Sequence, residues 1–150
     1  MNYKKQNKDK HSALNFVELE MGKMPPQAVE LEEAVLGALM LEKEALTSVI
    51  DILREEAFYK DANKKIFAAI RHLFEKSEAI DILTVTNELR KNGELETIGG
   101  AYYISQLTSK IASSANIEYH ARIVLQKFIQ RELIRFSSST NLANSFKNRK

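Results

Sequence analysis

The sequence predicts an all-α fold, a single globular helical bundle of about six helices. Apolar residues recur at helical spacing, most clearly at Ile66, Ile70 and Leu73. No segment alternates apolar and polar residues over the length of a strand. The 150 residues also include only two prolines and five glycines, which is few for a chain of short strands and turns.

Residues 1–24 are polar, charged and without sustained periodicity, which predicts a flexible N-terminal arm. Pro25-Pro26 end this arm, since neither proline can lie inside a helix and a proline is well tolerated only near a first turn. We therefore expect the first helix to begin near Gln27 or Ala28. Glutamates in its first turns complement the positive end of the helix dipole.

The first helix is predicted to be the buried centre of the bundle. Its stretch EEAVLGALML, from Glu32 to Leu41, is apolar on all sides from Ala34 onward. A helix that is hydrophobic all round is a buried one. Gly37 costs about 1 kcal/mol relative to alanine inside a helix, and close approach of a neighbouring helix would explain it.

Four shorter helices are predicted next, at residues 44–53, 61–76, 81–91 and 101–110. Each has an apolar stripe that we expect to surround the central helix. The stripe residues are Leu46, Val49, Ile50, Leu53, Ile66, Phe67, Ile70, Leu73, Phe74, Leu83, Val85, Leu89, Tyr103, Ile104 and Leu107.

Particular residues mark the ends of these helices. Asp61 and Asp81 are expected to act as N-caps. Gly93 suits the left-handed position that follows a helix end. Gly99-Gly100 predicts the turn before the fourth of the shorter helices.

The last helix is predicted from Asn116 to about Phe136, after the cap candidates Ser113 and Ser114. At 1.5 Å per residue it is about 30 Å long, roughly the width of the domain, so its far end should leave the core. One of its faces is an ordinary core stripe. That stripe consists of Ile117, Ala121, Val124, Leu125 and Phe128.

Tyr119, Ile123 and Ile134 fall on a different side of this helix. A second apolar face on a protruding helix indicates a surface for a partner. A helix enclosed within its own domain is the alternative, and the residues alone leave both open. Residues 137–150, SSSTNLANSFKNRK, are polar and turn-prone, and we expect a tail that is truncated before a second long helix.

Composition excludes several classes of protein. The length is that of about one domain. The absence of cysteine excludes disulfides and thiolate metal sites. The longest apolar run is far shorter than the ~20 residues that span a bilayer, and the Lys-rich start has no apolar h-region. We therefore expect no signal peptide, no membrane helix and a cytoplasmic location.

The charge distribution argues against a folded nucleic-acid-binding surface. The net charge is +2, of which residues 1–24 carry +2 and the last four residues +3, leaving −3 for residues 25–146. A nucleic-acid-binding module usually concentrates lysine and arginine on its folded face. A DNA-binding helical module that acts through its basic ends remains an alternative.

No residues nominate a catalytic, cofactor-binding or metal site. The histidines at 11, 72 and 120 lack the spacing of metal ligands on one helix. Gly99-Gly100 lacks the GxxxxGK[ST] pattern of a phosphate-binding loop. Adjacent acids such as Glu32-Glu33 and Glu55-Glu56 do not face each other on a helix, so we expect them on solvated faces. This chain is therefore not expected to be an enzyme.

Five segments occur in an order that resembles a known family. They are PPQAVELEEAVLGALML, AFYKDANKKIF, DILTVTNEL, GGAYYISQL and SANIEYHARIV. Together they resemble the N-terminal domain of the DnaB-type bacterial replicative DNA helicase, over about residues 25–136. One departure is Asn63, where the family usually has a histidine, so no family role for that histidine is carried over.

The resemblance implies a non-catalytic domain of an ATP-dependent hexameric helicase. ATP and Mg²⁺ are then expected only in a RecA-like C-terminal domain, which this chain lacks. The implied fold is a helical bundle followed by a hairpin, whose first helix would run from Asn116 to about Phe146. Paired hairpins make the N-terminal ring a trimer of dimers, and primase docks on the same tier. A helicase loader is a further candidate partner, and the ring formed by the parent protein is expected to bind DNA.

The resemblance also gives the second apolar face a purpose. Tyr119, Ile123 and Ile134 would meet the other hairpin helix or a neighbouring subunit. Ile117 and Ile123 are the leading candidates for positions that affect primase contact or hairpin packing. With half of the hairpin missing, weak or absent self-association is expected. The main alternative is the helicase-binding domain of primase, also a helical bundle plus hairpin, although that domain is C-terminal in primase.

Overall fold

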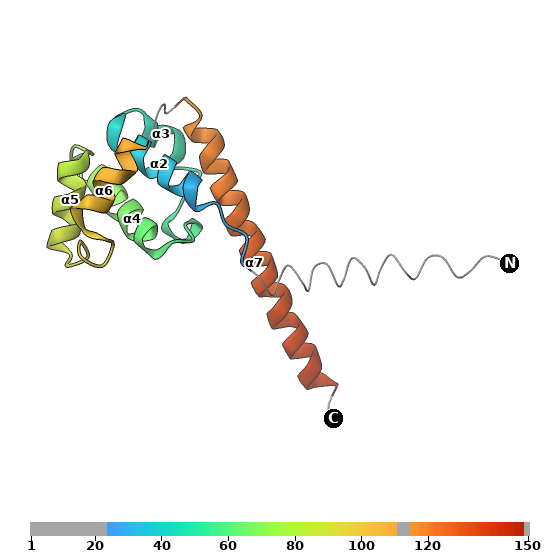
Figure 1. Cartoon of the computed structure of the whole chain (residues 1–150). Helices are drawn as coiled ribbons and strands as arrows, with labels where there is room; N and C mark the ends of the chain where they lie inside the picture. The colour runs from blue at the N-terminus through green and yellow to red at the C-terminus, as the bar shows by residue number, and fades with distance from the viewer. Residues whose placement is uncertain (1–23, 111–114, 149–150) are drawn as a thin grey trace. The chain divides into compact units, whose positions relative to one another are not determined.

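The computed structural model describes residues 24–110 and 115–148 of the chain. In these residues six α-helices and one 3-10 turn form, and no strand is found (Figure 1). The elements are α2 (Val29–Leu41), α3 (Ala45–Val49), η1 (Glu55–Ala57), α4 (Asp61–Glu75), α5 (Ile82–Lys91), α6 (Gly100–Ser109) and α7 (Ile117–Lys147). The predicted all-α class is confirmed. The arm before Met24 and the cap candidates Ser113 and Ser114 lie outside the described residues.

The chain divides into two units, each of which is considered on its own. The larger unit, Gln27–Gln130, contains the hydrophobic core. The described residues of the other unit are 24–26 and 131–148. There the Nη1 of Arg131 donates to the carbonyl oxygen of Pro26 at 2.8 Å. None of the described residues of this second unit is buried.

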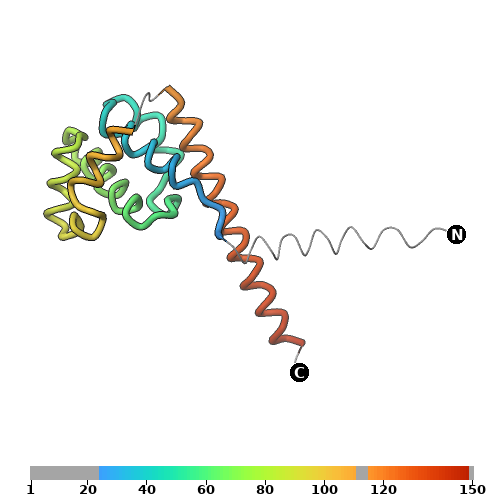
Figure 2. The backbone as a smooth tube through the Cα atoms, viewed as in Figure 1, coloured from blue at the N-terminus to red at the C-terminus, as the bar shows by residue number. Residues whose placement is uncertain are grey.

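Helix α2 is the centre of the larger unit. It packs against α3, α4 and α6, and α5 lies beside α4 and α6 (Figure 2). Every residue from Val35 to Met40 is buried, Gly37 included. The prediction of a buried central helix is therefore confirmed, except at its end, where Leu41 is 53% exposed. The largest fully buried side chains around and within it are Phe58, Phe67, Leu36, Leu39, Leu46, Leu53, Ile66, Ile70, Leu73, Leu89, Ile104 and Leu107.

Helix α5 begins and ends as its sequence predicts. The side chain of Asp81 accepts hydrogen bonds from the backbone N–H groups of Leu83 and Thr84, and the Thr84 hydroxyl accepts one from the Asp81 N–H. This is a capping box. At the other end Gly93 has a φ of 71°, and the N–H of Glu94 donates to the carbonyl of Leu89. That pairing is a Schellman motif, which requires the left-handed residue.

Helix α4 begins differently from the prediction. Asp61 is its first helical residue, not its N-cap, and its exposed carboxylate pairs with Lys64 at 3.4 Å. The N-cap position is Lys60, whose side chain does not cap the helix. The carboxylate of Glu32, from α2, instead accepts hydrogen bonds from the backbone N–H groups that precede the helix. Glu32 thus anchors the residues just before α4 and does not cap the helix, because a cap accepts from N–H groups within the first turn.

Two further expectations about the shorter helices are wrong. The helix predicted at residues 44–53 is only Ala45–Val49, and a turn after it carries Leu53 into the core. Phe74 and Leu83, predicted to face inward, are 40% and 75% exposed. Both lie near the connection between α4 and α5, where the helices leave the centre of the core.

Helix α7 is longer than its periodicity predicts. It continues through residues 137–147, which the sequence analysis assigned to a polar tail, and ends at Lys147. The end near Phe136 is therefore wrong, and the end near Phe146 implied by the resemblance is confirmed. Polar, weakly helix-forming residues do not stop a helix by themselves when neither proline nor glycine interrupts it.

Candidate partner interface

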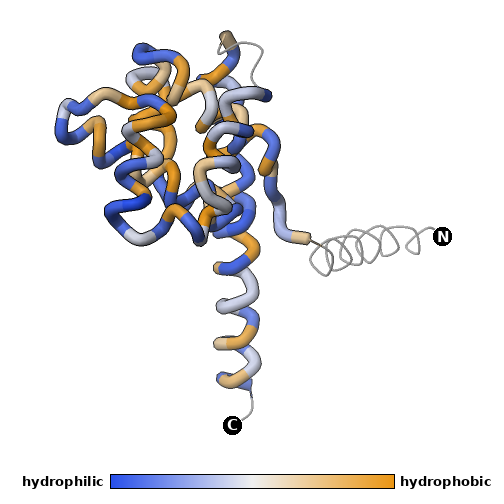
Figure 3. Tube along the Cα trace, turned by 60° about the vertical axis from the view of Figure 1, so that its left-hand side comes forward, coloured by the Kyte–Doolittle hydropathy of each residue, from blue (hydrophilic) through white to orange (hydrophobic). Residues whose placement is uncertain are grey.

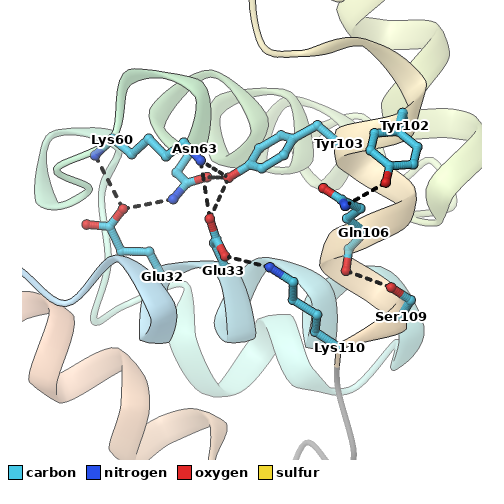
Figure 4. A network of polar contacts seen from close by, with 9 residues as sticks. All are labelled: Glu32, Glu33, Lys60, Asn63, Tyr102, Tyr103, Gln106, Ser109 and Lys110. Carbon is cyan, nitrogen blue, oxygen red and sulfur yellow. Dashed lines mark hydrogen bonds and ion pairs between the residues drawn. The ribbon is translucent and has the colours of Figure 1, made fainter.

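Two features of the described residues could carry function: a group of polar side chains inside the larger unit, and apolar side chains exposed along α7. The polar group joins α2, α4 and α6 (Figure 4). We name it the polar cluster. Its members are Glu32, Glu33, Lys60, Asn63, Tyr103 and Lys110.

Glu32 and Asn63 form the buried half of the polar cluster. Their residues are 1% and 0% exposed. The Asn63 amide donates to Glu32 Oε2 at 2.9 Å, and the backbone N–H of Tyr59 donates to Glu32 Oε1 at 2.6 Å. A buried carboxylate is tolerated when donors surround it. Glu32 therefore ties the start of α4 to α2, contrary to the prediction of a solvated face.

Tyr103 links the buried half to an ion pair nearer the surface. Its hydroxyl lies 2.7 Å from Asn63 Oδ1 and 3.1 Å from Glu33 Oε1, so its single proton serves one acceptor at a time. It accepts a hydrogen bond from Lys60 Nζ at 2.9 Å. The same ammonium pairs with Glu33 at 3.2 Å and lies 4.2 Å from the centre of the Tyr103 ring. Lys110 adds a second cation 3.6 Å from Glu33.

These contacts keep each group in its ordinary charge state near neutral pH. Burial disfavours the ionised form of Glu33, but hydrogen bonds from Lys60 and Tyr103 and the charges of both lysines outweigh it and hold its pKa below 4.5. Burial also opposes the charge of Lys60, but its hydrogen bonds to Tyr103 and Glu33 raise its pKa above 10.5.

The pKa of Tyr103 moves away from neutrality as well. Burial, helped by the charge of Glu33, raises it above 10.0 despite the nearby ammonium of Lys60. A general acid or base works best with a pKa near the operating pH. The pKa values of Glu33, Lys60 and Tyr103 are all shifted away from neutrality, so the polar cluster suits a structural role.

The rest of the described residues offers no candidate catalytic or metal-binding site. No group of three or more His, Asp or Glu side chains there could hold a metal ion. None of the described helices has both the length and the hydrophobicity to cross a membrane. An open groove of about 470 Å³ contains Arg71, but this guanidinium already pairs with Glu55 and Glu75. Its charge is thereby compensated within the chain.

The four residues predicted for a partner interface do not form one surface. Ile117 is 8% exposed and belongs to the core. Tyr119 is 66% exposed, and Ile123 is half-buried about 40° away around the helix. Ile134 is half-buried further along α7, about 20° around the helix from Ile123. Tyr119, Ile123 and Ile134 thus share a side of the helix, whereas Ile117 points to the opposite one.

A more exposed series of apolar residues on α7 was not predicted from the sequence. Ile129, Leu133 and Phe136 are 49%, 60% and 72% exposed. They follow the i, i+4, i+7 spacing that places residues on one face of a helix. We name these three residues the apolar stripe. The same spacing identified the core stripes, so it was visible in the sequence, but burial was needed to tell an outward stripe from an inward one.

Apolar positions continue beyond the apolar stripe. Leu142 and Phe146 are 62% and 72% exposed. Figure 3 shows apolar residues recurring along the last turns of α7 between polar ones. Scattered exposed apolar residues are normal on a monomer, whereas a contiguous series indicates an interaction surface.

Comparisons with known proteins point to one family. The family described as the DnaB-like helicase N terminal domain matches residues 24–126. The chain is 54% identical over 110 residues to the replicative DNA helicase DnaB of Rhodothermus marinus, covering 73% of this chain and 12% of that protein. It is 44% identical over 122 residues to the DnaB of Geobacillus stearothermophilus, covering 81% and 27%. It thus spans between about an eighth and about a quarter of the length of these curated relatives.

A solved structure agrees in fold as well as in sequence. It is the crystal structure of the N-terminal domain of DnaB helicase from Mycobacterium tuberculosis, which superposes with a TM-score of 0.82 at 34% identity. The match covers 85% of this chain and 91% of that one. At 34% identity the two chains are similar in sequence as well as in the arrangement of their helices.

Proposed function

Because the chain belongs to the family of DnaB-like helicase N-terminal domains, we propose that it is the non-catalytic assembly and docking domain of a replicative helicase. It serves two kinds of contact, one with other helicase subunits and one with primase. The parent protein is an ATP-dependent hexameric DNA helicase whose ATP, Mg²⁺ and DNA are handled outside these residues. It acts in the bacterial cytoplasm.

The apolar stripe is the observation that carries the assembly role. Ile129, Leu133 and Phe136 are between 49% and 72% exposed on a 31-residue helix. Their spacing of four and three residues is that of the seam between two paired helices. Burial of such side chains stabilises a contact by about 1.5–3 kcal/mol each. A second hairpin helix, or the hairpin of a neighbouring subunit, is the occupant that fits this spacing.

The exposed face at the start of α7 supports the docking role. Tyr119 and Ile123 lie there, within the residues that match the family. Tyrosine is enriched in the binding surfaces of proteins because its ring is apolar and its hydroxyl polar. Ile134 lies on the same side of α7 further along the helix, whereas Ile117 acts through packing in the core. A helicase loader competes for, or shares, the same domain.

Titration with primase tests the docking role. We expect the chain to bind the helicase-binding domain of primase in calorimetry, and Tyr119→Ala to weaken binding by about tenfold, since truncating an interface tyrosine costs more than 1 kcal/mol. Tyr102→Ala, on an equally exposed tyrosine of α6, is the matched control and should bind like the unaltered chain. No binding at all, or equal losses in both variants, would contradict the docking role.

The assembly role is tested in the intact subunit that carries this domain. Leu133→Glu places a charge in the apolar stripe and should shift the oligomer to smaller species in sedimentation. Leu83→Glu places the same charge on an exposed leucine of α5 and should leave the oligomer unchanged. If both variants assemble normally, the apolar stripe has no part in assembly.

Two other functions are separated by simple measurements. The family match favours the helicase domain over the helicase-binding domain of primase. Pure chain should hydrolyse no ATP, and a measurable rate would contradict a non-catalytic role. A DNA-binding module would show affinity that falls steeply between low and moderate salt, and we expect no such binding.

A further inference from the structure

Asn92 and Gly93 form the one Asn-Gly pair in the sequence, and they lie at the end of α5. Every other asparagine, such as Asn87 on the same helix, precedes a residue with a side chain. The pair has its own chemistry, because the backbone nitrogen of the second residue can attack the asparagine side chain. Glycine offers this nitrogen without a Cβ beside it. Asn92 is exposed, so water reaches the group that would react.

The reaction of an Asn-Gly pair is a cyclisation followed by hydrolysis. The Gly93 nitrogen forms a bond to Cγ of Asn92, and the side-chain nitrogen leaves as ammonia, which takes up the proton of the backbone amide. The product is a five-membered succinimide ring. Water then opens one of the two ring carbonyls and leaves aspartate or isoaspartate at this position. Water is the one co-reactant, and neither an oxidant nor a reductant is needed.

The end of α5 holds the pair in an unreactive conformation. The ψ angle of Asn92 is −5°, so the Gly93 nitrogen is eclipsed with the nitrogen of Asn92 about the Cα–C bond. Ring closure requires it to be eclipsed with Cβ instead, because Cβ and Cγ complete the ring. The peptide group between the two residues must therefore rotate before the reaction can occur.

Three contacts oppose this rotation. The N–H of Gly93 donates to the carbonyl of Arg90 at 3.1 Å, and the N–H of Glu94 donates to that of Leu89 at 2.9 Å. The second bond belongs to the Schellman motif, for which Gly93 takes its φ of 71°. Next to it, the Glu94 carboxylate pairs with Lys65 of α4 at 3.5 Å. The reaction therefore requires this helix end to open, a local motion that costs less than unfolding the whole chain.

We propose that Asn92 is a site of spontaneous deamidation whose rate is controlled by the capped end of α5. Isoaspartate lengthens the main chain by one carbon, so the cap no longer closes with its original geometry. Either product also places a negative charge at the C-terminal end of a helix, where the dipole disfavours it. The modification is irreversible and loosens the end of α5 and its ion pair with α4. The proposal is independent of the assembly and docking roles.

Peptide mapping of the whole chain by mass spectrometry, after storage at mildly alkaline pH, tests the site. Asn92 should convert to the acid and its isomer, whereas Asn87, also exposed but followed by Glu88, should stay unchanged. Gly93→Ala should abolish the conversion, because the added Cβ hinders the attack while it meets no other atom within 4 Å. Conversion of Asn87 as fast as Asn92, or no conversion in the native chain, would overturn the proposal.

The control by the cap is tested separately. Urea opens the cap and should speed the conversion at least about tenfold, the ratio that corresponds to 1.4 kcal/mol. Lys65→Ala removes the ion pair of Glu94 and should speed the reaction of the native chain by about twofold to fivefold. Lys64→Ala is the matched control, since it removes a pair with Asp61 inside α4, and it should leave the rate unchanged. Equal rates with and without urea, or equal effects of the two lysine variants, would overturn the control by the cap.

Discussion

The polar cluster and the apolar stripe reverse the usual distribution of side chains. In the polar cluster a carboxylate and an amide are buried, whereas three large apolar side chains of the apolar stripe are exposed. The buried polar groups all have partners within the chain, so their environment is complete. The apolar stripe is left half or more uncovered by the residues that the structure describes. The first region therefore serves the fold, whereas the second has the character of an interaction surface.

The largest expected difference comes from the same substitution in the core and in the apolar stripe. Leu36→Ala removes a side chain that is 0% exposed and should lower the free energy of unfolding by about 2–5 kcal/mol. Leu133→Ala, at 60% exposure, should change it by no more than about 0.5 kcal/mol. Urea unfolding of both variants measures this. A large loss for Leu133→Ala would place the apolar stripe among the structural residues.

Breaking the buried half of the polar cluster should cost nearly as much. Asn63→Ala leaves Glu32 without its amide donor and Tyr103 without its closer acceptor. We expect a loss of about 2–4 kcal/mol, because the groups left behind stay buried. Asn87→Ala, on an exposed asparagine that accepts from Arg90, is the matched control and should lie within about 0.5 kcal/mol. Similar values for both would show that the cluster is dispensable.

A smaller effect separates the two neighbouring tyrosines of α6. Tyr103→Phe removes the hydroxyl that joins Asn63, Glu33 and Lys60, and we expect a loss of about 1–2 kcal/mol in urea unfolding. Tyr102→Phe removes an exposed hydroxyl that accepts a hydrogen bond from Gln106 (Figure 4), and should be near neutral. Equal losses would mean that the rings, and not the hydroxyl, decide the stability.

Lowering the pH should weaken the ion pairs of Glu33 with Lys60 and Lys110 in the polar cluster. The pKa of Glu33 is lowered in the folded chain, so its contribution to stability is present above its ordinary 4.5 and is lost as the pH falls below that value. The effect is at most about 1 kcal/mol, since Lys60 and Lys110 are partly exposed. Glu33→Gln should flatten the decrease in stability between pH 5 and pH 3, roughly the range set by this pKa. An unchanged pH profile would show that Glu33 plays no part in it.

The helices and most of the core could be predicted from the sequence. Val35 to Met40 are buried on all sides as their composition predicts, and Asp81 and Gly93 mark the ends of α5 as their types predict. These signals are local, because a helix repeats every 3.6 residues and its caps lie within one turn. The resemblance to the helicase domain depended on the same local segments.

The candidate site was only half visible. Tyr119, Ile123 and Ile134 were predicted to form a second face, but Ile117 is in the core and the apolar stripe was not predicted. Spacing alone shows that apolar residues share a face of a helix and does not show which face the rest of the chain covers. Asp61 is not the predicted cap, because α4 already begins at this residue and its carboxylate pairs with Lys64.

By itself, the sequence determined that this chain is a bundle of helices around α2, because helical periodicity and capping act between residues a few positions apart. Only the tertiary structure decided that Glu32 is buried while Leu133 is exposed. The partners of Glu32 lie 27 to 31 residues away in the chain. Such distant neighbours decide whether a polar side chain finds its hydrogen-bond partners and whether an apolar side chain is covered. No local sequence pattern contains this information.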